Sequence, residues 1–207
     1  MKCSDHLGLR RDGDAYCDAE QYAVKLPTSI AFFLQASIIL LFLAGSSAPT
    51  PLYTVYQASW GFSPITVTVI FGCYAVAVLM ALLVAGSVSD HVGRRPVLLA
   101  TTLMQAGVMV LFIEADSVAM LIVARVGQGL ATGLAASAVG AGMLDLDRER
   151  GAVANAVAPM LGTATGAILS GVLVDYAPSP TTLVYAVLGA LYVMQFVGVV
   201  FMRALVS

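Results

Sequence analysis

The sequence predicts an all-helical integral membrane protein with six transmembrane helices. Of its 207 residues, 59% are hydrophobic and 11% charged, whereas soluble domains average about 45–50% apolar and about 25% charged residues. Six apolar stretches each approach the ~20 residues that cross ~30 Å of hydrocarbon as a helix. These stretches are continuously apolar rather than alternating, which favours helices over strands. We therefore expect lipid to be the main solvent of this chain.

Residues 1–27 precede the first apolar stretch and are polar with mixed charge. They lack the early apolar core of a secretory signal, so we expect a disordered cytosolic tail, with a misplaced start site as the alternative. Ser63-Pro64, and Pro96 after two arginines, are typical of helix starts. The six predicted membrane helices span about 28–46, 64–87, 96–114, 118–142, 152–174 and 182–203.

Lysine and arginine are distributed unevenly between the predicted links. Nine of the ten basic residues lie in the tail, in the second and fourth links, or at the very end of the last helix. The other three links contain none, and the tenth, Arg125, lies within a helix. Cytoplasmic loops are enriched in lysine and arginine. We therefore expect both termini in the cytosol and a multi-pass protein of the plasma membrane, the inner membrane of a bacterium.

The first link, residues 47–63, is long and aromatic. Its two prolines are expected to end or kink the first helix. Tyr53, Tyr56 and Trp60 suit the outer membrane–water interface, where aromatic side chains form belts. A belt is the simpler interpretation, and a role for Tyr53 or Tyr56 in a substrate vestibule is the alternative.

The sequence lacks the usual patterns of catalytic residues. It contains no HExxH, no paired carboxylates within an apolar stretch, and no serine–histidine–aspartate set. Its three cysteines, Cys3, Cys17 and Cys73, do not have the spacing of a metal or redox site. It has no basic run of the kind that binds nucleic acid. We therefore expect no enzymatic activity, no metal and no nucleic-acid partner.

Arg125 lies several residues inside the fourth apolar stretch. An arginine at the centre of a span costs about 2.5–3.5 kcal/mol by insertion scales, unless it faces water or protein. Snorkelling toward the nearer, outer interface is one interpretation. We favour the other, in which Arg125 faces a cavity and pairs with substrate, a carboxylate or the backbone. Gln128 shares its helix face, and Gly129 belongs to a series of small residues that permit close helix packing.

Small residues also recur in the fifth predicted helix, at Gly162 and Gly166. At a spacing of four they lie on one face and allow two helix backbones to approach closely. Static packing and a sliding interface predict the same pattern, so the spacing does not separate them. Pro159 lies in the same helix, removes one backbone hydrogen bond and is expected to kink it.

The link between the second and third predicted helices concentrates charge between two apolar stretches. It reads Gly86-Ser-Val-Ser-Asp90-His91-Val-Gly93-Arg94-Arg95-Pro96, which is too short for a domain and predicts a tight hairpin. Gly93 allows the turn, and Asp90 can accept hydrogen bonds from Arg94 or from a nearby helix start. Acidic residues on the same side can extend this into a charge network that opens as a cytosolic gate: Asp145, Asp147 and Glu149.

Two of these patterns resemble motifs of the major facilitator superfamily of transporters. Gly86-xxx-Asp90-His91-x-Gly93-Arg94-Arg95 is similar to the motif G-xxx-D-(R/K)-x-G-R-(R/K) between helices 2 and 3 of that family. Arg125-xx-Gln128-Gly129 is similar to the R-xx-Q-G motif of its fourth helix. Both matches lie at the expected helices, and the resemblance covers the chain after the tail.

The resemblance implies an amino-terminal bundle of six helices, built from two inverted repeats of three helices. In that fold helices 1 and 4 line the cavity, helices 2 and 5 face the other half, and helices 3 and 6 face lipid. It also implies that Asp90 and Arg94 hold the outward-facing state through the second half. Arg125 would belong to the coupling or substrate apparatus.

The sequence departs from the family pattern at three points. His91 replaces the usual arginine or lysine, which is expected to weaken the latch or to make it sensitive to pH. The fifth helix has Pro159-xx-Gly162-xxx-Gly166 but lacks the full G-P-xx-G-G pattern of drug–proton antiporters. Family members have twelve helices, whereas this sequence predicts six.

Together these observations predict a secondary transporter that moves a small solute by alternating access, represented here by one half. Drug–proton efflux is among its candidate forms. We expect no bound cofactor, coupling to protons, and association with a carboxy-terminal half or a second copy. A homodimeric transporter and a non-transporting membrane fragment or scaffold are the alternatives.

Overall fold

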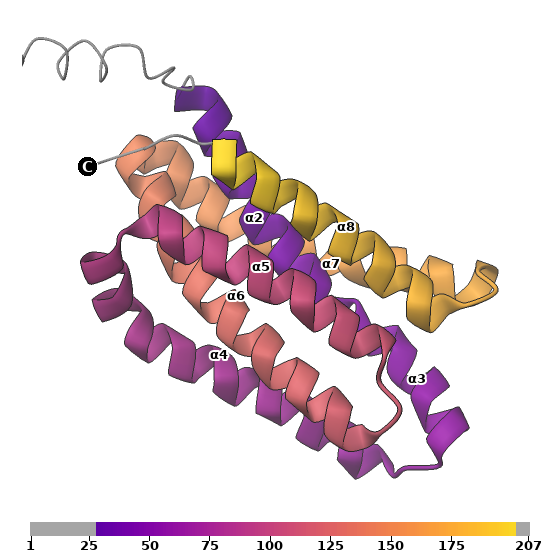
Figure 1. Ribbon diagram of the computed structural model, residues 1–207. Helices are drawn as coiled ribbons and strands as arrows, with labels where there is room; N and C mark the ends of the chain where they lie inside the picture. The colour runs from indigo at the N-terminus through magenta and orange to yellow at the C-terminus, as the bar shows by residue number, and fades with distance from the viewer. Residues whose placement is uncertain (1–27, 202–207) are drawn as a thin grey trace, which may run out of the picture.

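A computed structural model describes the backbone of residues 28–201 and their side chains apart from residues 28–29 and 86–91. The predicted tail, residues 1–27, lies outside the described residues. The described range is all-helical, as predicted, and Figure 1 shows its helices gathered into a bundle. In chain order the helices are α2 (Thr28–Ser47), α3 (Pro49–Trp60), α4 (Pro64–Val92), α5 (Arg94–Ile113), α6 (Val118–Leu146), α7 (Arg148–Tyr176) and α8 (Pro180–Phe201).

Six helical segments in the described range are long and apolar enough to cross a membrane. Helices α2 and α3 together form the first, Ile30–Trp60, and α4 to α8 supply one each. The predicted number and order of spans are therefore confirmed. The protein is a multi-pass membrane protein by the length and composition of these helices.

The first link differs from the prediction. Residues 49–60 are helical, and Ala48 keeps a helical backbone, with its N–H donating to the carbonyl of Ala44 at 3.0 Å. Pro49 begins α3, a position where proline is tolerated because its φ suits a helix and the missing N–H is cheapest there. The actual link is residues 61–63, where Gly61 ends α3 with φ of +66°.

The aromatic residues of this segment are mostly inside the bundle. Tyr53 is 3% exposed and Tyr56 is 5% exposed. An aromatic belt facing the membrane surface is therefore wrong for these two tyrosines. The prediction failed because it treated the segment as a loop, whereas a continuing helix carries both rings against α6 and α8, where they pack within the buried core.

Two of the helix junctions are shorter than predicted. Helix α4 continues to Val92 instead of residue 87, and α6 continues to Leu146 instead of 142. A single residue separates α4 from α5, and a single residue separates α6 from α7. Charged side chains do not end a helix where it leaves the apolar layer, because the backbone hydrogen bonds of the helix continue into water. We call this end of the bundle the basic end, because the links here carry the excess of lysine and arginine. It holds Arg94 and also the acidic residues Asp145 and Asp147.

The helix contacts repeat in a pattern that relates the first three spans to the last three. Helix α2 packs on α7 and α8, and correspondingly α6 packs on α4 and α5. The pairs α2·α6 and α5·α8 join equivalent helices of the two sets. Because each set contains three spans, the second enters the membrane from the opposite side. This is the arrangement of two inverted repeats.

Glycines allow the closest helix contacts in both sets. A Cβ at Gly129 would lie 2.6 Å from the carbonyl oxygen of Tyr74 on α4. A Cβ at Gly162 or Gly166 would collide with a carbonyl oxygen of α2. The small residues in α6 and α7 thus serve packing, and α7 remains helical on both sides of Pro159. Helices α2 and α6 lie at the centre of the bundle, whereas α4 and α7 expose the largest share of their surface.

Candidate functional site

Arg125 is the most deeply buried charge among the described residues. It lies on α6, is 0% exposed, and is the largest fully buried side chain. Its Nε donates to the hydroxyl of Tyr53 at 2.6 Å, and its Nη1 donates to the carbonyl of Ser46 at 2.8 Å and to Oε1 of Gln128 at 2.7 Å. The guanidinium therefore joins α6 to the first span on both sides of the α2–α3 junction.

Aromatic rings surround the rest of the guanidinium. Its central carbon lies 5.4 Å from the ring centroid of Tyr53, 5.2 Å from that of Phe71 and 5.3 Å from that of Tyr74. The last two rings come from α4. Aromatic faces attract a cation, by about 2 kcal/mol or more when the pair is desolvated. This enclosure lowers the cost of holding Arg125 within a membrane span.

Gln128 supplies a hydrogen bond that the helix backbone lacks at the α2–α3 junction. Pro49 has no N–H, so it cannot donate to the carbonyl of Gly45 four residues earlier. The Nε2 of Gln128 donates to that carbonyl at 2.9 Å, while its Oε1 accepts from Arg125. A buried backbone carbonyl without a partner is costly. The pair Arg125 and Gln128 thus stabilises the junction that Pro49 creates.

The structure decides part of what the sequence left open for this cluster. Snorkelling is wrong for Arg125, because the side chain has no contact with solvent. In this conformation the guanidinium is enclosed by side chains from three spans, and its predicted place in a transport cavity stays a prediction. The predicted pairing with backbone is confirmed, and so is the shared face of Gln128. Gly129 packs against α4.

Sequence reasoning missed Tyr53 as the partner of Arg125. The two residues are 72 positions apart, and nothing local to Tyr53 indicates which helix its hydroxyl meets. The available signal was weak. A tyrosine inside a helix that continues from an apolar span needs a partner for its hydroxyl when buried, and Arg125 is the strongest donor at a comparable depth.

The basic end holds a second, more exposed set of charges. Arg94 forms an ion pair with Asp145 at 2.5 Å between Nη2 and Oδ2, with side chains 34% and 58% exposed. Gly93 has φ of +86°, which a residue with a side chain rarely adopts, and it separates α4 from α5. Arg95 donates to the carbonyl of Val200 at 2.7 Å and to that of Val199 at 3.4 Å. It thereby ties α5 to the end of α8.

Residues of the predicted hairpin motif are placed only in part. Gly86, Asp90 and His91 belong to the helical backbone of α4, so Asp90 and His91 lie in its final turns and not in a loop. Their side chains lie outside the described residues, and the predicted contacts of Asp90 stay a prediction. The predicted link from Arg94 to the acidic residues at the end of α6 is present through Asp145.

Asp147 organises the start of α7. Its Oδ1 accepts from the backbone N–H of Glu149 at 3.1 Å and of Arg150 at 3.0 Å, which is an N-cap. Its other oxygen lies 3.5 Å from Nε of Arg150. The carboxylate therefore accepts from two N–H groups of the helix start, and its negative charge interacts favourably with the positive end of the helix dipole.

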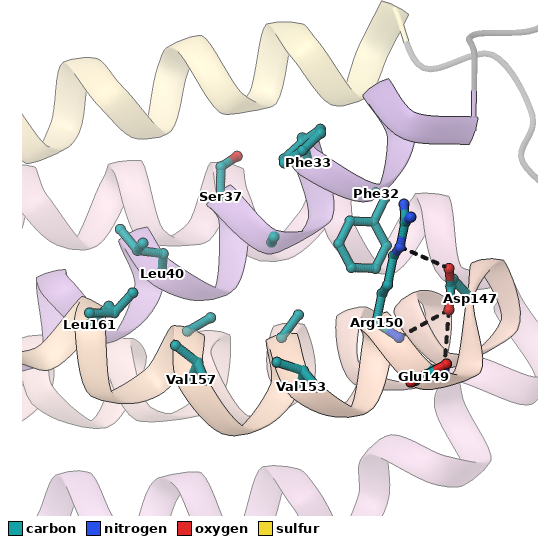
Figure 2. A pocket seen from close by; sticks show the side chains of 13 residues that line it. Phe32, Phe33, Ser37, Leu40, Asp147, Glu149, Arg150, Val153, Val157 and Leu161 are labelled. Carbon is teal, nitrogen blue, oxygen red and sulfur yellow. Dashed lines mark hydrogen bonds and ion pairs between the residues drawn. The ribbon is translucent and has the colours of Figure 1, made fainter.

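A groove of about 890 Å³ lies between α2 and α7, next to this cap. Figure 2 shows apolar side chains along both walls and charged side chains at one end. Its walls are mainly apolar, and Asp147, Glu149 and Arg150 make the end near the basic end of the bundle charged. Its labelled lining residues are Phe32, Phe33, Ser37, Leu40, Asp147, Glu149, Arg150, Val153, Val157 and Leu161.

The fold and the two charged sites define a helical membrane protein of the class that carries solutes across membranes. Six apolar spans in two inverted sets enclose a buried cation, and an arginine pair begins the third span directly after its one-residue junction with the second. The sequence profile of the Major Facilitator Superfamily matches residues 36–206. The chain belongs to this family, whose members are transporters and not enzymes. No curated protein was found to match the chain.

Proposed function

We propose that this chain moves a small solute across a membrane by alternating access, as one six-helix half of a secondary transporter. Its place in the plasma membrane of a bacterium, with the basic end toward the cytosol, is part of the proposal. The excess of lysine and arginine in the links at that end supports the orientation. The second half is either a carboxy-terminal bundle or a second copy of the chain.

The observation that carries this proposal is the enclosed Arg125. Intramembrane ionisable residues are rare and costly, and they mark substrate or ion pathways. Arg125 binds both sides of the α2–α3 junction through Ser46 and Tyr53. A movement of the outer segment α3 relative to α2 would therefore break or re-form contacts to this cation. Such a two-state contact is what an alternating mechanism needs.

The groove between α2 and α7 is the proposed solute-facing surface. Its apolar walls and charged end fit an amphipathic solute, and drugs are among such compounds. Coupling to protons is part of the proposal, although the described membrane spans offer no carboxylate near their centre to carry one. Where the second half is a separate carboxy-terminal bundle, we propose that the proton carrier lies on that bundle.

A homodimer is the second candidate, and exposed apolar side chains on α4 and α7 offer a surface for it. Helices α4 and α7 present large residues that are well exposed in the single bundle, including Leu83 at 80% and Met160 at 72%. Large exposed apolar patches mark interaction sites in soluble proteins, and on a membrane protein they face lipid or another bundle. A scaffold that transports nothing is the remaining alternative.

Solute flux tests the proposal. Uptake of a panel of amphipathic solutes is measured in proteoliposomes that contain this chain alone, and in membrane vesicles of the source organism with the gene deleted or restored. Flux in proteoliposomes indicates a homodimer, and flux restored only in vesicles indicates a separate partner. No gene-dependent flux in either preparation contradicts transport.

Arg125→Ala is the variant that tests the role of the buried cation. We expect it to lower flux at least tenfold, because the α2–α3 junction loses its clamp. Arg148→Ala is the matched control, since Arg148 is an exposed arginine at the basic end and should leave flux unchanged. Flux that survives in Arg125→Ala at normal expression would contradict the role assigned to Arg125.

A further inference from the structure

Two N–H groups of Arg125 have no acceptor. Its Nη2 is buried without a hydrogen-bond partner, whereas Nε and Nη1 are occupied by Tyr53, Ser46 and Gln128. A guanidinium carries five donors, two of them on Nη2. A buried donor without an acceptor is costly, and more so on a charged group. The cluster therefore lacks one acceptor at a defined atom.

The charge of Arg125 is also unbalanced. Among the described side chains, the ion pairs of arginine join Arg94 to Asp145 and Arg150 to Asp147, both at the basic end. The three rings around the guanidinium attract it through their faces. They do not supply a hydrogen-bond acceptor to Nη2. The missing partner is therefore an acceptor that carries negative charge.

Two tyrosine hydroxyls lie in the same buried region. Tyr185 on α8 is fully buried, neighbours the hydroxyl of Tyr56, and lies within electrostatic range of Arg125. The hydroxyls of Tyr56 and Tyr185 are buried and interact with each other, and neither has any other hydrogen-bond partner. A hydroxyl can donate as well as accept. When one hydroxyl donates to the other, the pair still keeps one free O–H in the region of the cation.

We propose that Nη2 of Arg125, together with the hydroxyls of Tyr56 and Tyr185, binds a small anion: a halide ion or the carboxylate of the transported solute. Charge-assisted hydrogen bonds from a guanidinium to an anion are among the strongest that proteins form. The inference rests on the proposed function, because the site is closed in this conformation and opens to the anion during the transport cycle. It places anion recognition at the first, fourth and sixth spans.

Binding to the purified full chain in lipid nanodiscs tests this site without any flux. Trp60 is the only tryptophan of the chain, and its ring centroid lies 4.9 Å from that of Tyr56. Its fluorescence therefore reports on the site. Sodium chloride and sodium acetate are titrated at constant ionic strength against the sodium salt of HEPES, a bulky sulfonate that is neither a halide nor a carboxylate. We expect a saturable change with at least one of the two probes.

Variants assign the response to the three donors. Arg125→Gln removes the charge and should weaken binding at least tenfold. Tyr56→Phe and Tyr185→Phe each remove one hydroxyl and should weaken it several-fold. Arg148→Gln removes an exposed arginine and should leave binding unchanged. Because Tyr56→Phe also alters the surroundings of Trp60, the rise in melting temperature with anion concentration serves as a second readout.

The outcomes separate the two sources of the anion. Saturation by chloride without competition from acetate assigns an inorganic anion, and saturation by acetate, alone or in competition, assigns a carboxylate. If Arg125→Gln does not fold, the double variant Tyr56→Phe with Tyr185→Phe takes its place and should weaken binding tenfold.

Two results would overturn the anion site. They are the lack of any saturable response in the folded wild-type chain, and an equal response in the variants. Internal water would then satisfy Nη2. Flux without anion binding would overturn this inference alone, whereas anion binding without gene-dependent flux would overturn the proposed function alone.

Discussion

Arg125 and Arg94 are both held by partners on other helices, but the two sites differ in solvent and in the number of bonds. Arg125 makes three hydrogen bonds inside the bundle and has no exposed surface. Arg94 makes one ion pair with Asp145 in which both side chains are partly exposed. Water competes with the ion pair of Arg94 and Asp145, but not with the hydrogen bonds of Arg125. The interior therefore fixes structure, and the basic end is free to exchange partners.

This difference suits the two sites to different tasks. A gate must open and close at little cost, so its ion pairs need to be weak and replaceable. A clamp on the α2–α3 junction must hold one geometry until a solute or ion changes it. The predictions below test this contrast, beginning with the interior.

The largest loss of stability is expected at an interior glycine that has no room for a side chain. Gly166→Ala places a methyl group against the carbonyl of Ala44 on α2, a backbone contact that cannot yield locally. Overpacking of this kind costs about 1–3 kcal/mol, occasionally more, and we expect a loss of at least about 2 kcal/mol of unfolding free energy here. Reversible unfolding of the purified chain in mixed micelles measures it.

Gly171→Ala is the matched control for this prediction. Gly171 lies on the same helix, but a Cβ there meets nothing within 4 Å. The substitution should leave stability unchanged or raise it slightly, because alanine favours the helix more than glycine does. Equal losses at both positions would show that the close contact of α7 with α2 is not what the glycine provides.

Gln128→Leu should have an intermediate effect in the interior. It leaves the carbonyl of Gly45 without a donor, and an unsatisfied buried acceptor costs about 1–3 kcal/mol. Pro49→Ala supplies the missing backbone N–H to that carbonyl. We therefore expect Gln128→Leu to cost about 1 kcal/mol less in the Pro49→Ala background. Unfolding of the four members of this double-mutant cycle measures the coupling, and strict additivity would contradict the link between Pro49 and Gln128.

The sequence could predict the spans and the basic end because both depend on local signals. Apolar length located six spans, and a turn was expected at Gly93, which has a positive φ in the structure. An ion pair between Arg94 and an acidic residue was expected, because acidic residues had to lie on the same side of the membrane. Lengths of α4 and α6 were underestimated, since a polar side chain was taken as the end of a helix.

For the interior, the sequence predicted that the buried cation needs partners but not which residues supply them. A cation at position 125 needs acceptors, but the sequence does not indicate which carbonyls are free. The Gly45 carbonyl is available because Pro49 lacks an N–H, and that consequence appears only once residues 49–60 are known to be helical. Tyr53 was assigned to an interface for the same reason. Contacts of this kind depend on how helices pack, which periodicity alone does not specify.

The smallest effect is expected at the basic end. Arg94→Ala should change unfolding free energy by less than about 1 kcal/mol, the usual range of an exposed ion pair, and salt should shrink the difference. Asp145→Ala should match it, with little further loss in the double variant. Arg95→Ala is the informative comparison, because Arg95 donates to two carbonyls near the end of α8. It should cost more than Arg94→Ala and respond less to salt, since its partners are backbone groups and not a solvated carboxylate. If Arg94→Ala proved as damaging as Gln128→Leu, the basic end would be a structural clamp like the interior, and its use as a gate would have to be abandoned.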